Sequence, residues 1–140
     1  MNVRLAMLAI CELDNLLERC IQQASLNLSA PQLKAKVSEE RNRLGIKFPF
    51  LGVARDVHDT HKHGQLHRPS AKVSQAQKPT TVCHGGSGLL GFGSIGEGSL
   101  GEGPSEYLVI VADDGRTHEL GSVIAQCEEH LKAEVQRLGS

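Results

Sequence analysis

Aromatic residues are scarce in this chain of 140 residues. They make up 3% of the sequence, and there is no tryptophan. Aromatic rings are the surfaces on which proteins commonly stack the bases of single-stranded nucleic acid, so this mode of binding has few side chains to support it. The core must instead be built from leucine, isoleucine, valine and alanine.

The sequence also lacks a large net charge, a long apolar run and a regular cysteine pattern. Its formal net charge is -1 with histidine neutral, which argues against a general polyanion-binding surface. No stretch approaches the roughly 18 apolar residues that cross a bilayer, and the first residues do not form a secretory signal. The four cysteines contain no CxxC pair, as in proteins of reducing compartments. We therefore expect a cytoplasmic protein without a membrane partner.

Hydrophobic periodicity predicts an amphipathic helix over residues 3–25. Apolar residues recur there at intervals of three and four, which places them on one helix face. The predicted buried stripe runs through Leu5, Ala9, Leu13, Leu16, Cys20 and Ala24, and Ile10, Leu17 and Ile21 widen it.

A second helix is expected after Ser29 and Pro31, which suit a cap and a first helical turn. Gly45 is expected to stop it after about Leu44. The charged side chains of this helix are expected to form a solvent-exposed face, because they outnumber its apolar residues.

Pro49 is expected to keep the hydrophobic connector 46–51 out of a helix, since the residue before a proline disfavours helical backbone. A short third helix is predicted over residues 53–63, ending at Gly64. It contains most of the chemistry-bearing side chains of the chain.

The second half of the chain predicts a small antiparallel sheet. Residues 71–77 alternate weakly, as in an edge strand, and the segments 106–112 and 116–120 flank an Asp-Gly pair that is typical of a two-residue hairpin turn. Ser122 is expected to cap a last helix that ends at Leu138. Helices, then a sheet, then a helix define the α+β class.

We expect one domain over residues 1–140. Its helical part covers residues 1–70, a weak strand and a glycine-rich loop cover 71–104, and the hairpin with the last helix covers 105–140. The glycine-rich tract matches GxGxxG three times, but a dinucleotide site needs a strand before that motif and a helix after it. More glycine and a proline follow instead, so no cofactor is expected.

Residues 52–68 hold four of the seven histidines, together with two arginines, a lysine and two aspartates. Three interpretations of this segment remain open. In the first it is a zinc site, because imidazole nitrogens and thiolates are good zinc ligands. The candidate ligands are His58, His61, His63 and His67, with Cys83 and His84 as additional donors.

The second interpretation is catalytic. Arg55 is followed by the polar Asp56, four further residues and His61. This arrangement resembles the Arg-polar-x4–6-His signature of the HEPN family of small helical domains, many of which are metal-independent RNA endonucleases of defence and toxin systems. The resemblance rests on these positions within the first seventy or so residues.

The HEPN resemblance implies a role for each of these side chains. Arg55 would bind the phosphate of RNA through parallel hydrogen bonds, and His61 would take the proton from the ribose 2′-hydroxyl. His63 and Asp56 are less favoured catalytic candidates. A homodimer would bring two Arg-His pairs together, and no metal or cofactor would be needed.

The third interpretation is structural. His61 shares a helix face with Val53 and Val57, so it would hydrogen-bond within the core, while His58 and Lys62 lie outside. Arg55 would pair with Asp59 one turn later. The protein would then be a non-catalytic interaction or assembly module that meets a protein partner by strand addition.

Overall fold

The computed structural model describes residues 2–84 and 105–139, so the predicted glycine-rich loop and its GxGxxG matches lie outside the described residues. The elements are α1 (Val3–Gln23), α2 (Ala30–Lys47), α3 (Pro49–His63), β1 (Thr80–His84), β2 (Ser105–Val111), β3 (Thr117–Glu119) and α4 (Leu120–Gly139). This order confirms the predicted α+β class.

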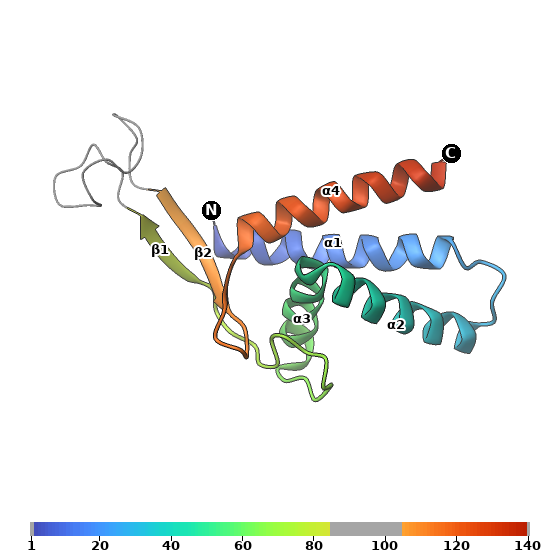
Figure 1. The fold of residues 1–140 in the computed structure, drawn as a ribbon, viewed down its shortest axis with the longest axis horizontal. Helices are drawn as coiled ribbons and strands as arrows, with labels where there is room; N and C mark the ends of the chain where they lie inside the picture. The colour runs from blue at the N-terminus through green and yellow to red at the C-terminus, as the bar shows by residue number, and fades with distance from the viewer. Residues whose placement is uncertain (1, 85–104, 140) are drawn as a thin grey trace.

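The four helices enclose the core, and α3 is the element at its centre. Figure 1 shows α3 running across the direction of α1, α2 and α4, with the sheet at the end of the molecule where α1 begins. α3 packs against each of the other helices, and eight of its residues between Leu51 and Thr60 are buried. One cluster of buried apolar residues includes side chains from every helix and from β2.

The predicted boundary between the second and third helices was wrong. α2 continues through Gly45 to Lys47, and Pro49 is the first residue of α3 rather than part of a connector. Proline suits a first helical turn because its missing N–H has no partner there, and Phe48 before it is extended. Gly45 instead lets α2 and α3 approach closely, since a Cβ on Gly52 would lie 3.0 Å from the carbonyl oxygen of Gly45.

The buried face of α1 differs from the predicted stripe. Leu5 and Leu16 are exposed, whereas the widening residues of the prediction lie at the core. The buried positions are Ala6, Ile10, Asp14, Leu17 and Ile21. The prediction failed because the carboxylate of Asp14 lies in the middle of the buried face.

The sheet has the order β1-β2-β3, with both pairs antiparallel. The predicted hairpin of β2 and β3 is confirmed, but residues 112–116 separate its strands where a two-residue loop was expected. Gly115 in this turn has a positive φ of 82°. The strand expected at residues 71–77 is not formed; that segment holds only an isolated bridge between Gln65 and Gln75, and β1 follows it. Leu108 of β2 is buried in the core cluster.

α4 begins two residues before the predicted cap, Ser122. The carboxylate of Glu119 accepts hydrogen bonds from the backbone N–H of Gly121 at 2.7 Å and from that of Ser122 at 2.6 Å. Val123, Cys127 and Leu131 of this helix are buried, whereas the apolar side chains beyond Leu131, Val135 and Leu138, are exposed. No helix in residues 2–84 and 105–139 is long and apolar enough to cross a bilayer.

Candidate functional site

A buried ionic cluster surrounds α3, and we call it the arginine–aspartate network. It consists of Asp14, Arg41, Arg55, Asp56, His58, Asp59 and Arg68. Five of these residues belong to the histidine-rich segment 52–68 that the sequence singled out. The network therefore decides which of that segment's side chains are available for chemistry.

Asp14 is the carboxylate that joins three helices. Its Oδ2 atom accepts a hydrogen bond from Arg41 of α2 and lies 2.6 Å from Nδ1 of His58 of α3. Arg41 also reaches Oε2 of Glu18 at 3.5 Å. His58 is 4% exposed, so its expected position on the outside of α3 was wrong. A buried carboxylate needs polar partners, and the contact with Asp14 places His58 on the buried side of α3.

Asp56 fixes the segment that follows α3. One of its oxygens accepts a hydrogen bond from Arg68, and the other accepts hydrogen bonds from the backbone N–H groups of Lys72 and, at 3.1 Å, Val73. Both carboxylate oxygens are thus engaged within the protein. Asp56 therefore anchors the loop after α3, and neither oxygen is free to transfer a proton.

Arg55 pairs with Asp59, as the structural interpretation predicted. Its Nε atom lies 3.6 Å from Oδ2 of Asp59, and Nη1 donates to Oδ1 of Asn42 at 2.6 Å. Burial, and then the positive charges of Arg68 and Arg41, lower the pKa of Arg55 below its ordinary value. The guanidinium is held by neutral and anionic partners on α2 and α3, in a region already crowded with positive charge.

The described residues contain one group of potential metal ligands, Asp14, His58 and Asp59, with ligand atoms within 4.8 Å of one another. Oδ2 of Asp14 already accepts a hydrogen bond from Arg41. Oδ2 of Asp59 accepts one from Nη1 of Arg68 at 2.8 Å. The positive charges of Arg41 and Arg68 at these carboxylates oppose the binding of a metal cation there.

The predicted zinc ligands do not gather in the described part of the chain. His58 is buried in the network, whereas His61, His63 and His67 are exposed and join no potential ligand group there. Cys83 is exposed on β1. The histidine density of the segment reflects several separate environments, with no shared centre among the described residues.

His61 is exposed, which corrects the expectation that it lies in the core with Val53 and Val57. The two valines are buried, and the periodicity that aligns His61 with them holds. Residues 61–65 are all exposed, because the last turn of α3 extends past the elements that cover its earlier turns. Periodicity alone does not show where along a helix the cover ends.

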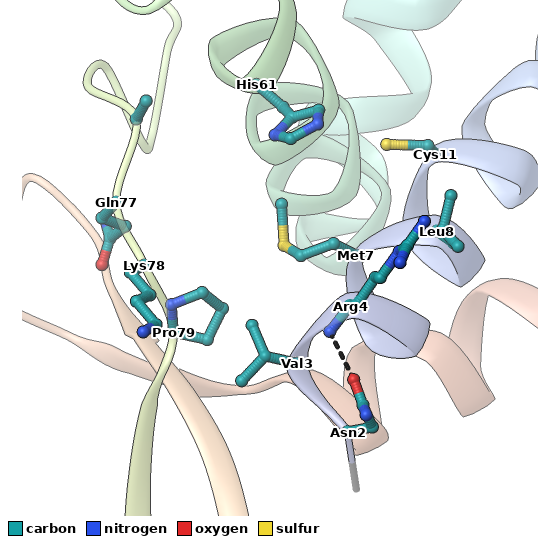
Figure 2. A pocket seen from close by; sticks show the side chains of 11 residues that line it. Asn2, Val3, Arg4, Met7, Leu8, Cys11, His61, Gln77, Lys78 and Pro79 are labelled. Atoms are coloured by element: carbon teal, nitrogen blue, oxygen red, sulfur yellow. Dashed lines mark hydrogen bonds between the residues drawn. The ribbon is translucent and has the colours of Figure 1, made fainter.

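An open groove of about 930 Å³ lies beside His61, between the start of α1 and the segment before β1. We call it the N-terminal groove, and Figure 2 shows its side chains. It is lined by Asn2, Val3, Arg4, Met7, Leu8, Cys11, His61, Ala76, Gln77, Lys78 and Pro79. Among the described residues that line it there are apolar side chains and cationic groups but no carboxylate.

Arg55 and His61 lie in different places within one chain. Arg55 borders a small hollow of about 40 Å³ together with Arg41 and Arg68, whereas His61 borders the N-terminal groove. The two side chains of the HEPN-like pair therefore border different hollows. Sequence reasoning missed the groove because its walls come from three segments far apart in the chain.

No protein-family model, no curated protein and no solved structure matches this chain.

Proposed function

We propose that this protein is a protein-binding module, and that its N-terminal groove holds an apolar partner segment that carries carboxylates. The observation that supports this most directly is the lining of the groove, which combines apolar side chains with cationic ones. The proposal keeps the predicted class of interaction module, with a groove rather than a sheet edge as the binding surface.

The apolar part of the groove comes from α1 and from the segment before β1. Val3, Met7 and Leu8 lie on one side, and Pro79 lies opposite them (Figure 2). Leu8 is 53% exposed, and the neighbouring Leu5 is 64% exposed. Contiguous exposed apolar side chains beside a concave surface are typical of interaction sites, because covering them removes apolar surface from water.

The charge of the groove selects the partner. Arg4 and Lys78 are cationic, while the described lining residues include no acid. Oppositely charged groups across an interface favour association and suppress wrong partners. A segment with leucine-like and acidic side chains matches both properties of the groove. The described lining contains no Phe, Tyr or Trp side chain for base stacking, which favours a peptide over single-stranded nucleic acid.

Short labelled peptides rich in leucine and glutamate test this proposal, with leucine–lysine and serine–glutamate peptides as matched sets. We expect fluorescence anisotropy to detect binding of the leucine–glutamate set, and Leu8→Asp to weaken it by about tenfold or more, which corresponds to ~1.4 kcal/mol. Replacing Arg4 and Lys78 together by glutamate is expected to shift the preference to the leucine–lysine set.

Lys132→Glu is the control for charge, because this exposed lysine lies on α4 and does not line the groove. It should leave peptide binding unchanged. If no peptide set is preferred, or if Lys132→Glu acts as strongly as the groove variants, the proposed function is wrong.

Ribonuclease activity is a second candidate, and one observation favours it. His61 is exposed to solvent in a groove that also holds Arg4 and Lys78, so an imidazole and two cations meet at one surface. General-base catalysis on RNA needs an accessible imidazole and a cation near the phosphate. Arg55 borders a different hollow, so the cation near the phosphate would come from Arg4, from Lys78 or from another chain.

Incubation of the purified protein with single-stranded RNA in EDTA tests this second candidate. If it holds, the products carry 2′,3′-cyclic phosphates, and His61→Ala lowers the rate by about 10²–10⁴-fold, as loss of a general base does. Arg55→Ala separates the HEPN-like arrangement from one that uses Arg4 and Lys78. His67→Ala, at an exposed histidine that does not line the groove, is the matched control, and intact RNA after incubation with folded protein excludes the activity.

A further inference from the structure

A second concave surface lies at the other end of the helices, and we call it the distal hollow. Its volume is about 450 Å³. It forms because α1 packs against both α2 and α4, whereas α2 and α4 have no extensive contact with each other in the described chain. Figure 1 shows α1 between these two helices, and its last turns, which border the hollow, lie at the end away from the sheet. The hollow is thus a groove with α1 at its floor and α2 and α4 as its walls.

The floor of the distal hollow is apolar. Leu17 and Ile21 of α1 belong to the buried core cluster, and Cys20 and Leu44 border the hollow beside them. Leu17 and Ile21 are buried, whereas Cys20 and Leu44 are only partly buried, so covering these two side chains removes further apolar surface from water.

The same end of the molecule carries exposed apolar side chains of matching kind. Val135 is 59% exposed and Leu138 is 37% exposed, both on the last turns of α4. Leu138 is seven positions after Leu131 and therefore continues the buried face of α4, beyond the point where other elements cover it. The distal hollow and the exposed side chains of Val135 and Leu138 thus lie on one surface patch.

We propose that a second copy of this chain covers the distal hollow, with the last turns of α4 of each copy placed in the hollow of the other. A two-fold dimer uses one patch twice, so the patch must be complementary to itself. Leu138 and Val135 supply the projection, and the α1 floor supplies the cavity.

The charges around the distal hollow fit a second copy better than a partner of one sign. Glu40 pairs with Lys36 at 3.3 Å and with Arg43 at 2.9 Å, and Glu134 pairs with Arg137 at 2.8 Å. The rim is therefore compensated by its own ion pairs and attracts neither a polyanion nor a polycation. A second copy presents the same compensated rim, and the net charge of -1 per chain gives little repulsion between copies.

Light scattering over a range of protein concentrations tests the dimer. We expect the mass to approach twice that of one chain as concentration rises. Val135→Asp and Leu138→Asp, alone and together, are expected to raise the dissociation constant by about tenfold or more. Ala133→Asp is the matched control, because it adds the same carboxylate to an exposed position on the same turns of α4 and should leave the dimer intact.

Cys20 gives a second measurement that needs no substitution. It borders the distal hollow and is half-buried, so dimer formation should slow its reaction with a thiol reagent as protein concentration rises. Cys83 on β1 is exposed and should react at one rate throughout. Mass spectrometry of the labelled peptides distinguishes the two sites.

The proposal is overturned by a mass of one chain at every concentration. It is equally overturned if a dimer forms but Cys20 labelling does not slow, or if Ala133→Asp disrupts the dimer as strongly as Leu138→Asp. None of these outcomes bears on peptide binding at the N-terminal groove, which lies at the opposite end of α1.

Discussion

Asp14 is the residue on which the packing of three helices depends. It lies on the buried face of α1 and contacts Arg41 of α2 and His58 of α3. Removing a carboxylate from such a cluster leaves its cationic partner buried without compensation, which typically costs about 3–5 kcal/mol. The same contacts remove His58 from any surface chemistry.

Single-residue roles were predictable only where the partners are close in sequence. The pairing of Arg55 with Asp59 follows from their spacing of one helical turn, and the structure confirms it. Asp14 and His58 are 44 positions apart, and nothing in the sequence links them. For that reason the histidine that the sequence placed outside is buried, and the one that it placed in the core is exposed.

The acid dependence of stability can be predicted at Asp59. Burial opposes its ionisation, but the hydrogen bond from Arg68 and the charges of Arg41, Arg68 and Arg55 outweigh it and lower the pKa of Asp59. Its contribution to stability is therefore complete above the unfolded-state pKa of about 3.9 and is lost as pH falls through the lower folded-state value. Asp59→Asn should cost about 1.5–3 kcal/mol near pH 7, the range for charged hydrogen bonds.

Urea unfolding from pH 7 to pH 3 measures this effect. The difference in unfolding free energy between the wild type and Asp59→Asn should narrow below about pH 4. Asp114→Asn is the control, because Asp114 is exposed and its partner Arg116, at 3.5 Å, is exposed as well. A difference that widens toward low pH would contradict the argument.

Among the elements, the crossing of α2 and α3 depends on two glycines. A Cβ on Gly52 would lie 3.0 Å from the carbonyl oxygen of Gly45 and 3.4 Å from its Cα. These backbone atoms cannot move aside as a side chain can. The helices therefore approach each other more closely than any larger residue would allow.

Gly52→Ala should destabilise the protein although alanine favours helix. The gain in helix propensity is about 1 kcal/mol, while overpacking typically costs about 1–3 kcal/mol and separates α2 from α3. Gly139→Ala is the matched control, since nothing lies within 4 Å of a Cβ there. Thermal unfolding should show a lower Tm for Gly52→Ala and no loss for Gly139→Ala. An unchanged Tm for Gly52→Ala would mean that the helices can separate at little cost.

Elements were predictable where the signal is local. The hairpin of β2 and β3 follows from alternating strands around a turn that needs a positive φ at Gly115. Gly45 and Pro49 are ambiguous, because glycine ends helices and also lets them touch, while proline breaks helices and also begins them. Only the tertiary packing decides between these roles, and here it decided against the local expectation.

For the whole molecule, the α+β class followed from the order of the elements, whereas the surfaces did not. The N-terminal groove needs residues of α1, α3 and the segment before β1, and the distal hollow needs three helices. Such surfaces depend on how elements are placed relative to one another, which periodicity does not contain. Leu5 and Leu16 of α1 were accordingly assigned to the core, although both are exposed.

The parallel course of α1 and α4 bears on how the protein should be produced in the laboratory. The two helices begin at the same end and run in the same direction, so the first and last described residues lie at opposite ends of the helical part (Figure 1). Asn2 lines the N-terminal groove, and Leu138 lies on the patch with the distal hollow. An affinity tag fused before α1 would therefore compete with peptides, and one fused after α4 would hinder self-association, so each assay calls for a tag at the far end.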